Sequence, residues 1–504
     1  MSKKPLFAIV IFVAVLGILE ITSRTLESHL SREASAGRQP KGWQAEFFRS
    51  FFDWHEPDPD LLWRFRANLN NPLIRTNSDH LLGGQVTQKK TSNTFRILLL
   101  GDSSPVGHGL KERRLAFGEQ LRAMLEQEYL GLRNIELVNA SVSGYTSEQI
   151  VRLLKIRGWS YRPDLVILYC GNNDASISGE LTDRELFHGR RLIGVRKGLA
   201  NLALYRILRS ILLPRERKTA PETKQLTVRV SPEQYAENLD KIATQCREHN
   251  CPLIILKPPV PLLWPAGLQF RLFRHITGEN GQLIFPEKMG AILGRPLKYC
   301  ISEERFRSLY GRGDIFTREV FRSAYFDSLT PKQAIAYYTR MLDKGGNDPV
   351  LLNNLGVSFW EDRRYSMADL YLRTAREQYA KNHRGENGYA IIAAGSPFLY
   401  NIGINLLTAD SGASAPRFDS TTAAIYLDSA LQADFFSLRI KKTYREMIDR
   451  YAARKMILVI DLPGIFADNG GERLFIDHCH PTQAGHRLIA SSIYREIKRN
   501  RLIR

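Results

Sequence analysis

Short, nearly continuous apolar runs recur along the chain at wide spacing, which is the pattern of strands buried on both faces of a parallel sheet. Helical stretches lie between them, among them Ala116–Tyr129, Ser147–Lys155 and Pro232–His249. This alternation predicts an α/β fold with a doubly wound, five-stranded parallel sheet. The predicted strands are Phe95–Leu100, Ile135–Asn139, Leu165–Tyr169, Pro252–Leu256 and Met456–Leu462.

The stretch between the fourth and fifth runs departs from this pattern and repeats a helical one. Ala334 and Tyr338 lie 34 residues before Ala368 and Leu372, and 34 residues is the period of tetratricopeptide repeats. A looser copy runs through residues 400–427. We therefore predict an inserted α-helical region of tetratricopeptide-like repeats. The alternative is a set of amphipathic helical hairpins with no binding role.

At the N-terminus, Lys3 and Lys4 precede an apolar run, Leu6–Leu19. The run is short for a membrane-spanning helix, which needs about 20 residues, and long for the core of a cleaved signal peptide. We predict an uncleaved membrane anchor, with the N-terminus in the cytoplasm and the body of the chain outside it, in the periplasm. A cleaved signal and a buried helix are the alternatives.

These patterns divide the chain into five predicted segments. Residues 23–94 are mixed and polar, and Pro57-Asp58-Pro59 marks a turn within them. The segments are 1–22, a membrane anchor; 23–94, a stalk or lead-in; 95–262, the first part of the α/β core; 263–440, the helical insert; and 441–504, the last part of the core.

The formal net charge of +19 indicates an anionic partner or surface. No zinc-finger, RRM or helix-turn-helix pattern is present, so anionic lipid and acidic glycan are favoured over nucleic acid. Segment 184–229 holds twelve Lys or Arg against three Glu. It predicts contact with a bilayer or an acidic glycan, or else a basic helix face packed on the domain. The five cysteines argue against a disulfide framework, although Cys246 and Cys251 could pair.

Candidate chemistry lies where the predicted strands end. Ser103 follows the first strand, within Gly101-Asp102-Ser103-Ser104, and precedes a predicted helix. Open α/β sheets bind ligands at this position, where the hydroxyl is exposed and backbone N–H groups face an anion. Alone the motif is weak, because Gly-Asp-Ser occurs by chance in about one of ten chains of this length.

Two further strand ends carry residues suited to bind an oxyanion. Gly144 follows the second strand, where a glycine allows dihedrals that turn its N–H into a site. A plain turn glycine is the alternative. Asn173 follows the third strand, and its amide is able to donate to a developing oxyanion. Its alternative is an Asx-turn or a helix cap.

After the fifth strand comes Asp477-His478-Cys479-His480-Pro481. An Asp three residues before a His shares one turn with it and orients the imidazole from its far nitrogen. The near nitrogen is then free to take a serine proton. The alternative is a metal site from Asp477, His478, Cys479 and His480, which is disfavoured because adjacent side chains usually point apart.

In this order, the four fragments resemble the SGNH hydrolase family, also called GDSL esterases and lipases. Its Ser, Gly, Asn and His blocks look like Ser103, Gly144, Asn173 and His480. The resemblance implies a flavodoxin-like SGNH fold with Ser103, Asp477 and His480 as the catalytic triad. It implies an oxyanion hole made by the N–H groups of Ser103 and Gly144 and the amide of Asn173. The chain is similar in particular to bacterial-type members with an N-terminal membrane segment.

The resemblance implies a serine esterase of the acylesterase or deacetylase type, acting on an acylated carbohydrate or lipid through an acyl-enzyme, with no cofactor and no metal. One alternative is an O-acyltransferase that modifies a polysaccharide. Another is a non-catalytic, membrane-tethered scaffold that uses the helical repeats. Expected partners are the acylated glycan or lipid, the membrane through the N-terminal helix, and a protein bound by the insert; nucleic acid is not expected.

Overall fold

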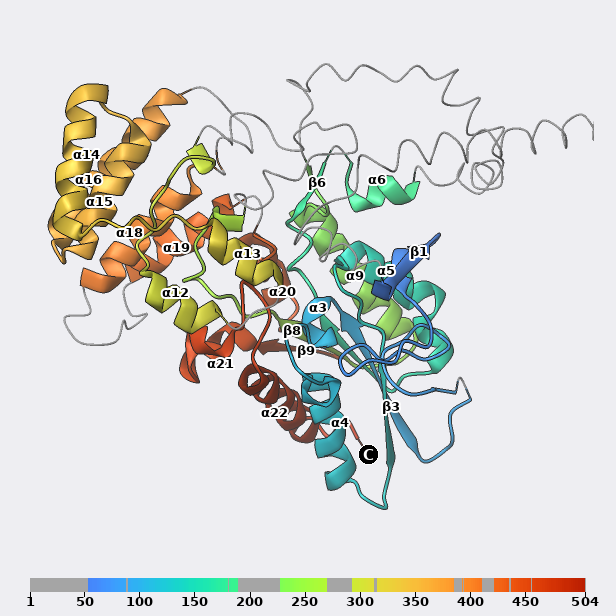
Figure 1. Cartoon of the computed structure of the whole chain (residues 1–504). Coiled ribbons are helices and arrows are strands. Elements are labelled where there is room, and N and C mark those ends of the chain that lie inside the picture. Colours follow the sequence, from blue (N-terminus) through green and yellow to red (C-terminus); the bar gives the residue numbers. More distant parts are fainter. Residues whose placement is uncertain are drawn as a thin grey trace, which may run out of the picture. The chain divides into compact units, whose positions relative to one another are not determined.

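In a computed structural model of the chain, all five predicted strands are present and form one parallel sheet (Figure 1). Each strand begins and ends within about one residue of its predicted bounds, so the predicted fold class is confirmed. Across the sheet the order is β4 (Asn134–Asn139), β3 (Thr94–Gly101), β5 (Leu165–Tyr169), β8 (Leu253–Lys257) and β9 (Ile457–Asp461). Because the first of these strands, β3, lies inside the sheet, the winding reverses beside it, and ligands bind at such reversals.

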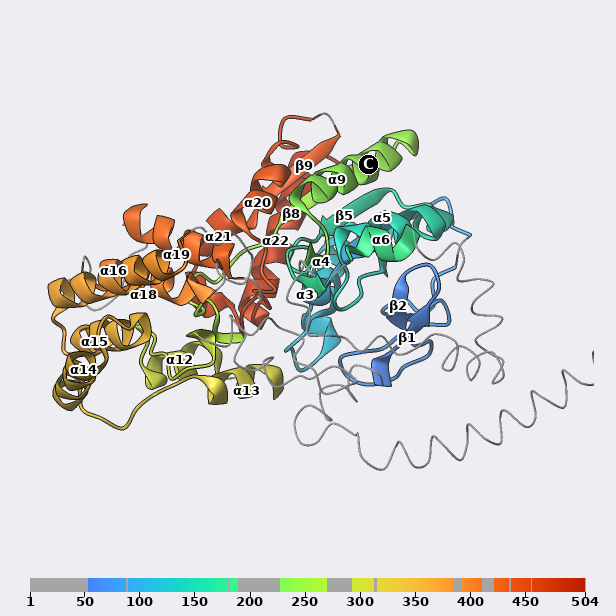
Figure 2. The ribbon, with the colours of Figure 1, turned by 90° about the horizontal axis from the view of Figure 1, so that it is seen from above.

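Helices cover both faces of the sheet, which explains why its strands are continuous apolar runs. Ile97 and Leu99 of β3 belong to one apolar core with α4 (Phe117–Glu128) and α22 (Gln483–Arg499). Leu98 and Leu100 belong to a second core with α5 (Ser147–Ile156) and α9 (Pro232–Glu248). Helices α4 and α22 lie side by side in Figure 1, and α5 lies beside α9 in Figure 2.

The structure describes residues 53–87, 89–179, 181–188, 227–269, 292–311, 315–384, 392, 394–409, 421–434, 437–454 and 456–503. Apart from residues 184–188, they belong to one compact unit, Phe52–Asp183 with Gln225–Arg504. The predicted anchor, residues 1–22, and most of the basic segment 184–229 lie outside the described residues. Among the helices that are described, none combines the length and apolar character that crossing a bilayer requires.

The lead-in, expected as a stalk, is packed into the α/β core from residue 53 onwards. Strands β1 (His55–Asp58) and β2 (Leu62–Phe65) form an antiparallel pair that was not predicted, and the turn between them overlaps the one expected at Pro57-Asp58-Pro59. Phe65 and Ile74 are buried in the same core as α5 and α9. Residues 53–87 of the predicted stalk or lead-in therefore pack on the α/β core through apolar side chains such as Phe65 and Ile74.

The insert is helical, as predicted. Its helices pack in sequence as antiparallel neighbours, α14 with α15, α15 with α16, α16 with α18 and α18 with α19 (Figure 1, yellow to orange). A Cβ at Gly356 would lie 2.8 Å from Leu372 Cγ, and one at Gly403 would lie 2.8 Å from Leu427 Cγ, so both glycines permit close helix approach. That the repeats are tetratricopeptide-like stays a prediction, as do the domain boundaries. The bounds are α14 (Pro331–Gly345), α15 (Pro349–Glu361), α16 (Tyr365–Asn382), α18 (Ser396–Ala409) and α19 (Thr421–Ala433).

All five cysteines are free thiols, including Cys246 and Cys251.

The remaining elements are short. The short elements are α3 (Ser103–Val106), η1 (Arg113–Leu115), η2 (Gly158–Tyr161), β6 (Ile177–Gly179), α6 (Asp183–His188), β7 (Thr227–Val228), α12 (Glu303–Tyr310), α13 (Ile315–Ser323), α20 (Lys442–Asp449), α21 (Leu462–Asp468) and η4 (Gly471–Leu474).

Candidate active site

A tight strand-to-helix turn presents the predicted nucleophile. Ser103 is the first residue of α3, directly after β3, and its side chain is partly exposed. Asp102 caps the helix by accepting a hydrogen bond from Ser104 N at 2.9 Å. A Cβ at Gly101 would lie 2.6 Å from both Tyr169 O and Pro105 Cγ, so only glycine fits there. The turn therefore fixes the Ser103 hydroxyl at the carboxyl edge of the sheet.

A second tight turn holds Asp477 and His480 together. Asp477 Oδ1 accepts hydrogen bonds from Cys479 N at 2.9 Å and from His480 N at 2.8 Å. The carbonyl of His480 accepts from Ile476 N at 2.8 Å. This arrangement leaves Asp477 Oδ2 beside the imidazole of His480, which is the orientation that a three-residue spacing predicts.

The two turns meet although 377 residues separate Ser103 from His480. His480 Nε2 lies 2.7 Å from Ser103 Oγ, and His480 Nδ1 lies 2.7 Å from Asp477 Oδ2. Both distances are those of hydrogen bonds to a polarised or charged partner. The structure thus joins the three predicted residues in the order nucleophile, base and orienting carboxylate.

Electrostatics in this triad favour proton transfer to the histidine. Burial opposes the charge of Asp477, but His480, His478 and the donated hydrogen bonds hold the pKa of its carboxyl well below the usual value. Burial also disfavours a charged imidazole, yet the Asp477 carboxylate raises the pKa of His480 well above its ordinary value. The charged aspartate therefore strengthens His480 as a base for the Ser103 proton.

The predicted oxyanion donors lie on the loops that follow β4 and β5, the two neighbours of β3. Gly144 has a φ of +80°, a conformation that few other residues adopt. The carbonyls around it are held in place, because Trp63 Nε1 donates to Ser143 O at 3.0 Å and Arg229 Nη1 donates to Gly144 O at 2.7 Å. Asn173 Nδ2 donates to Tyr145 O at 3.1 Å, which engages one of its two amide hydrogens.

Buried polar residues tie the Asn173 loop to the nucleophile turn. Asn172 Nδ2 donates to Asp102 Oδ2 at 3.2 Å, and Asn172 Oδ1 accepts from Ile440 N at 3.1 Å. Asp174 Oδ1 accepts from Ser147 N at 3.0 Å, at the start of α5. Burial raises the pKa of Asp102 to about 6 and that of Asp174 to about 7. These carboxyls support the two loops through their hydrogen bonds, and their pKa values lie close to neutral pH.

Three residues near the triad were not predicted. The ring centroids of His108 and His480 lie 5.2 Å apart. A Cβ at Gly144 would lie 3.3 Å from Trp63 Cζ2, so the Trp63 ring covers that glycine. Arg229, within the basic segment 184–229, pairs with Asp183 at 2.8 Å as well as binding Gly144 O. None of these contacts has a local sequence signal, because each joins elements far apart in the chain.

The alternative of a metal site concerns the same turn. Ligand atoms of Asp477, Cys479 and His480 all lie within 4.8 Å of one another. Burial raises the pKa of the Cys479 thiol to about 11, whereas a thiolate is the form that binds metals. Asp477 and His480 are engaged with each other and with Ser103. The turn fits a catalytic triad better than a metal site.

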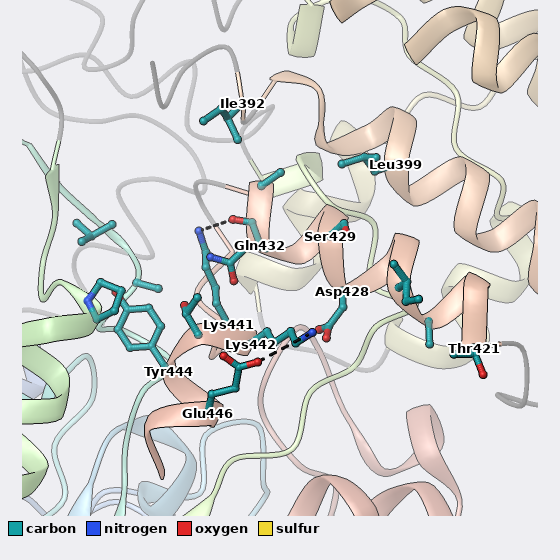
Figure 3. Close-up of a pocket in the computed structure, with 17 residues that line it drawn as sticks. Ile392, Leu399, Thr421, Asp428, Ser429, Gln432, Lys441, Lys442, Tyr444 and Glu446 are labelled. Atoms are coloured by element: carbon teal, nitrogen blue, oxygen red, sulfur yellow. Dashed lines mark hydrogen bonds and ion pairs between the residues drawn. The ribbon is translucent and has the colours of Figure 1, made fainter. Parts of the chain in front are cut away.

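A cavity of about 880 Å³ adjoins the Asn173 loop at Ala175, and helices α19 and α20 supply most of its lining (Figure 3). Lys441 Nζ donates to Gln432 O at 3.0 Å in its wall, and burial lowers the pKa of Lys441 to about 8. The volume lies within the range of small-molecule sites. Ser103 and His480 are not among the described residues that line it, so we assign it no step of the reaction.

An open parallel sheet with a nucleophilic serine, a histidine and an aspartate at its carboxyl edge defines a serine hydrolase domain of the α/β class. Residues 97–271 match the family model of the GDSL-like lipase/acylhydrolases. The chain therefore contains a GDSL-like lipase/acylhydrolase domain, the family that the sequence analysis calls SGNH hydrolases. The matched residues contain Ser103, Gly144 and Asn173, whereas Asp477 and His480 lie beyond the insert.

Three of the solved structures that are similar to the chain show how distant these likenesses are. The crystal structure of TesA is 21% identical, with 33% of this chain and 62% of that chain covered and a TM-score of 0.21. An α/β hydrolase, LAE5, from the metagenome of Lake Arreo, Spain, is 12% identical, with 80% and 95% covered and a TM-score of 0.30. A catalytic mutant of Axe2, an acetylxylan esterase from Geobacillus stearothermophilus, is 11% identical, with 81% and 96% covered and a TM-score of 0.29.

The chain thus spans about three fifths of the length of the TesA structure that it matches. No curated protein matches the chain in sequence. Likenesses this distant name no substrate for this chain.

Proposed function

We propose that this chain is a serine ester hydrolase of the acylesterase or deacetylase type that acts on an acylated carbohydrate or lipid. The observation that carries the proposal is the continuous pair of 2.7 Å hydrogen bonds from Ser103 through His480 to Asp477. A histidine that serves only packing does not require a serine hydroxyl on one ring nitrogen and a carboxylate on the other, whereas a catalytic base does.

In the first half of the reaction, Ser103 Oγ attacks the ester carbonyl carbon while its proton passes to His480 Nε2. The former carbonyl oxygen becomes an oxyanion, which the N–H groups of Ser103 and Gly144 and the Asn173 amide stabilise. His480 then gives the proton to the departing alkoxide, and the acyl group stays on Ser103 as an ester. Asp477 stabilises the imidazolium while it exists.

In the second half, His480 takes a proton from a water molecule whose oxygen attacks the acyl-enzyme. The tetrahedral intermediate expels Ser103 Oγ, which recovers its proton from His480, and a carboxylic acid leaves. A sugar hydroxyl in place of water would give acyl transfer by the same steps. Product analysis with and without a sugar acceptor distinguishes the two outcomes.

The nucleophile is tested by labelling the full chain with a fluorophosphonate probe and by turnover of a small acetyl ester. Wild type is expected to react, and Ser103→Ala and His480→Ala are expected to lose labelling and at least a thousandfold of turnover (about 10³ or more). Ser104→Ala is the matched control, because this neighbouring serine is fully buried. Labelling that persists in Ser103→Ala, or disappears in Ser104→Ala, would contradict the proposal.

We also propose that residues 1–22 anchor the chain in a membrane with the esterase domain on the extracytoplasmic side. The support is the apolar run Leu6–Leu19 behind Lys3 and Lys4. Alkaline carbonate washing should leave the full chain in the membrane fraction and release a chain that starts at residue 23. Release of the full chain by carbonate would refute the anchor.

A further inference from the structure

The helical insert presents the same residue at equivalent points of two successive repeats. Asn354 precedes Gly356 by two residues in α15, and Asn401 precedes Gly403 by two residues in α18. Both glycines pack closely on a leucine of the following helix. Both asparagines are buried, and a buried amide requires hydrogen-bond partners.

Their partners are backbone groups of one irregular segment. Asn354 Nδ2 donates to Pro296 O at 2.7 Å, and Asn354 Oδ1 accepts from Lys298 N at 2.9 Å. Asn401 Nδ2 donates to Lys298 O at 3.0 Å, and Asn401 Oδ1 accepts from Cys300 N at 2.8 Å. Each amide therefore binds the carbonyl of one residue and the N–H of the second residue after it. A two-residue step is the repeat of an extended chain.

The bonds of Asn354 and Asn401 to this segment form what we call the asparagine ladder. A third asparagine, Asn353, connects the two sets of bonds. Asn353 Nδ2 donates to Lys298 O at 3.0 Å, and Asn353 Oδ1 accepts from Asn401 Nδ2 at 2.8 Å. The central peptide unit of the segment is thereby bound from both repeats. Because these bonds are made to the main chain, they hold an extended segment without selecting its side chains.

Selectivity for the sequence of the segment comes from one cationic side chain, that of Lys298. Lys298 Nζ lies 2.6 Å from Glu361 Oε2 and 3.1 Å from Asp327 Oδ2, and the lysine side chain is only 4% exposed. At the start of the segment, Arg295 Nη1 lies 2.8 Å from Asp348 Oδ2 at the N-terminus of α15. A lysine at the position of residue 298 therefore has an acidic, largely buried pocket.

We propose that the helical insert is a binding site for an extended, lysine-containing peptide, and that the chain's own residues Arg295–Cys300 are the ligand. The asparagine ladder supplies affinity through the main chain, and the Glu361–Asp327 pocket supplies specificity. Covalent connection gives the segment an effective concentration on the order of millimolar, so it fills the site in the intact chain. This second site is independent of ester chemistry.

The experiment empties the site and offers the ligand from solution. Lys298→Glu in the full chain places a carboxylate against Glu361 and Asp327, which should release the segment. A fluorescent peptide with the sequence of residues 294–302 is then expected to bind Lys298→Glu and not wild type. The same peptide with glutamate in place of its lysine should bind neither chain. Fluorescence anisotropy under reducing conditions measures the binding.

Matched variants separate the ladder from general packing. Added to Lys298→Glu, Asn354→Ala or Asn401→Ala should weaken peptide binding about tenfold each, because each removes two hydrogen bonds to the segment. Asn405→Ala should leave it unchanged, because Asn405, one turn further along α18, donates to Tyr365 O and not to the segment. A folded Lys298→Glu chain that fails to bind the peptide, or wild type that binds it equally, would overturn the proposal.

If Lys298→Glu does not fold, amide hydrogen exchange tests the asparagine ladder instead. In the otherwise native chain, Asn401→Ala should speed exchange of the Cys300 amide at least tenfold (about 10-fold or more) relative to Asn405→Ala, because Asn401 Oδ1 is the acceptor of that amide. Equal exchange in the two variants would refute the ladder. Neither measurement uses ester turnover, so failure here and failure of the proposed esterase are distinguishable.

Discussion

At the scale of single residues, the charge of Asp477 sets both the rate and the pH range of the proposed reaction. Asp477→Asn keeps the size of the side chain but removes the charge that orients and stabilises the imidazole, so kcat should fall about 10⁴-fold. Catalysis needs neutral His480, and the aspartate raises the pKa of that histidine. The acid limb of kcat/KM should therefore lie at lower pH in Asp477→Asn than in wild type. A pH–rate profile whose acid limb is unmoved would contradict this account.

Gly144 allows a matched test of the oxyanion hole. Gly144 has a φ of +80°, and Gly131, in an exposed turn, has a φ of +76° with no atom within 4 Å of an added Cβ. Alanine at either position should cost about 1 kcal/mol of unfolding free energy from backbone strain. Only Gly144→Ala should also lower kcat, by about 10²–10³, because it displaces an oxyanion donor. Equal kcat values in the two variants would remove Gly144 from the hole.

At the scale of elements, helix spacing in the insert depends on glycine. In Gly356→Ala the new Cβ would lie 2.8 Å from Leu372 Cγ and 3.1 Å from its backbone nitrogen, so α15 and α16 must separate. We expect a loss of about 1–3 kcal/mol in unfolding free energy. Gly345→Ala, in the last turn of α14 with nothing within 4 Å, should instead gain up to about 1 kcal/mol. Denaturant titrations of both variants measure the contrast, and destabilisation by both would show that the helix contact is not the cause.

Element prediction from sequence succeeded for the strands of the parallel sheet and for the helices α4, α5 and α9 that cover it, and missed the short strands β1 and β2. The sheet strands, buried on both faces, are continuous apolar runs and were located to about one residue. Strand β1 was not predicted, because a proline and two carboxylates in four residues give no strand pattern. The turn expected at Pro57-Asp58-Pro59 overlaps the turn that follows β1, where Asp58 Oδ1 accepts hydrogen bonds from Asp60 N and Leu61 N. The candidate triad residues could be picked out because strand ends carry local motifs. The asparagine ladder was not, since its partners are backbone groups far away in the sequence.

At the scale of the whole molecule, one buried carboxyl joins the sheet, the insert and the C-terminal part of the chain. Glu472 accepts hydrogen bonds from Tyr310 Oη of α12 and from Leu263 N, after β8. Burial raises its pKa from 4.5 to about 7. Between these values the folded state binds more protons than the unfolded state, so the unfolding free energy decreases as the pH rises through this window.

Glu472→Gln isolates that contribution from those of Asp102 and Asp174, which change in the same sense. Wild type should lose up to about 3 kcal/mol more than Glu472→Gln when the pH is raised from about 4.5 to about 7. Urea titrations across this range measure the difference. Parallel pH dependences in the two proteins would show that Glu472 is ionised in the folded state throughout.

The separation of 377 positions between the serine and the histidine has a consequence for biosynthesis. At about 5–20 residues per second, a ribosome needs about 20–75 seconds to make that stretch. Throughout this interval the nascent chain carries its serine without a base to accept the proton, and for most of it without the edge strand β9. A polypeptide that stops short of residue 480 should therefore be inert toward esters, however well its first strands have folded.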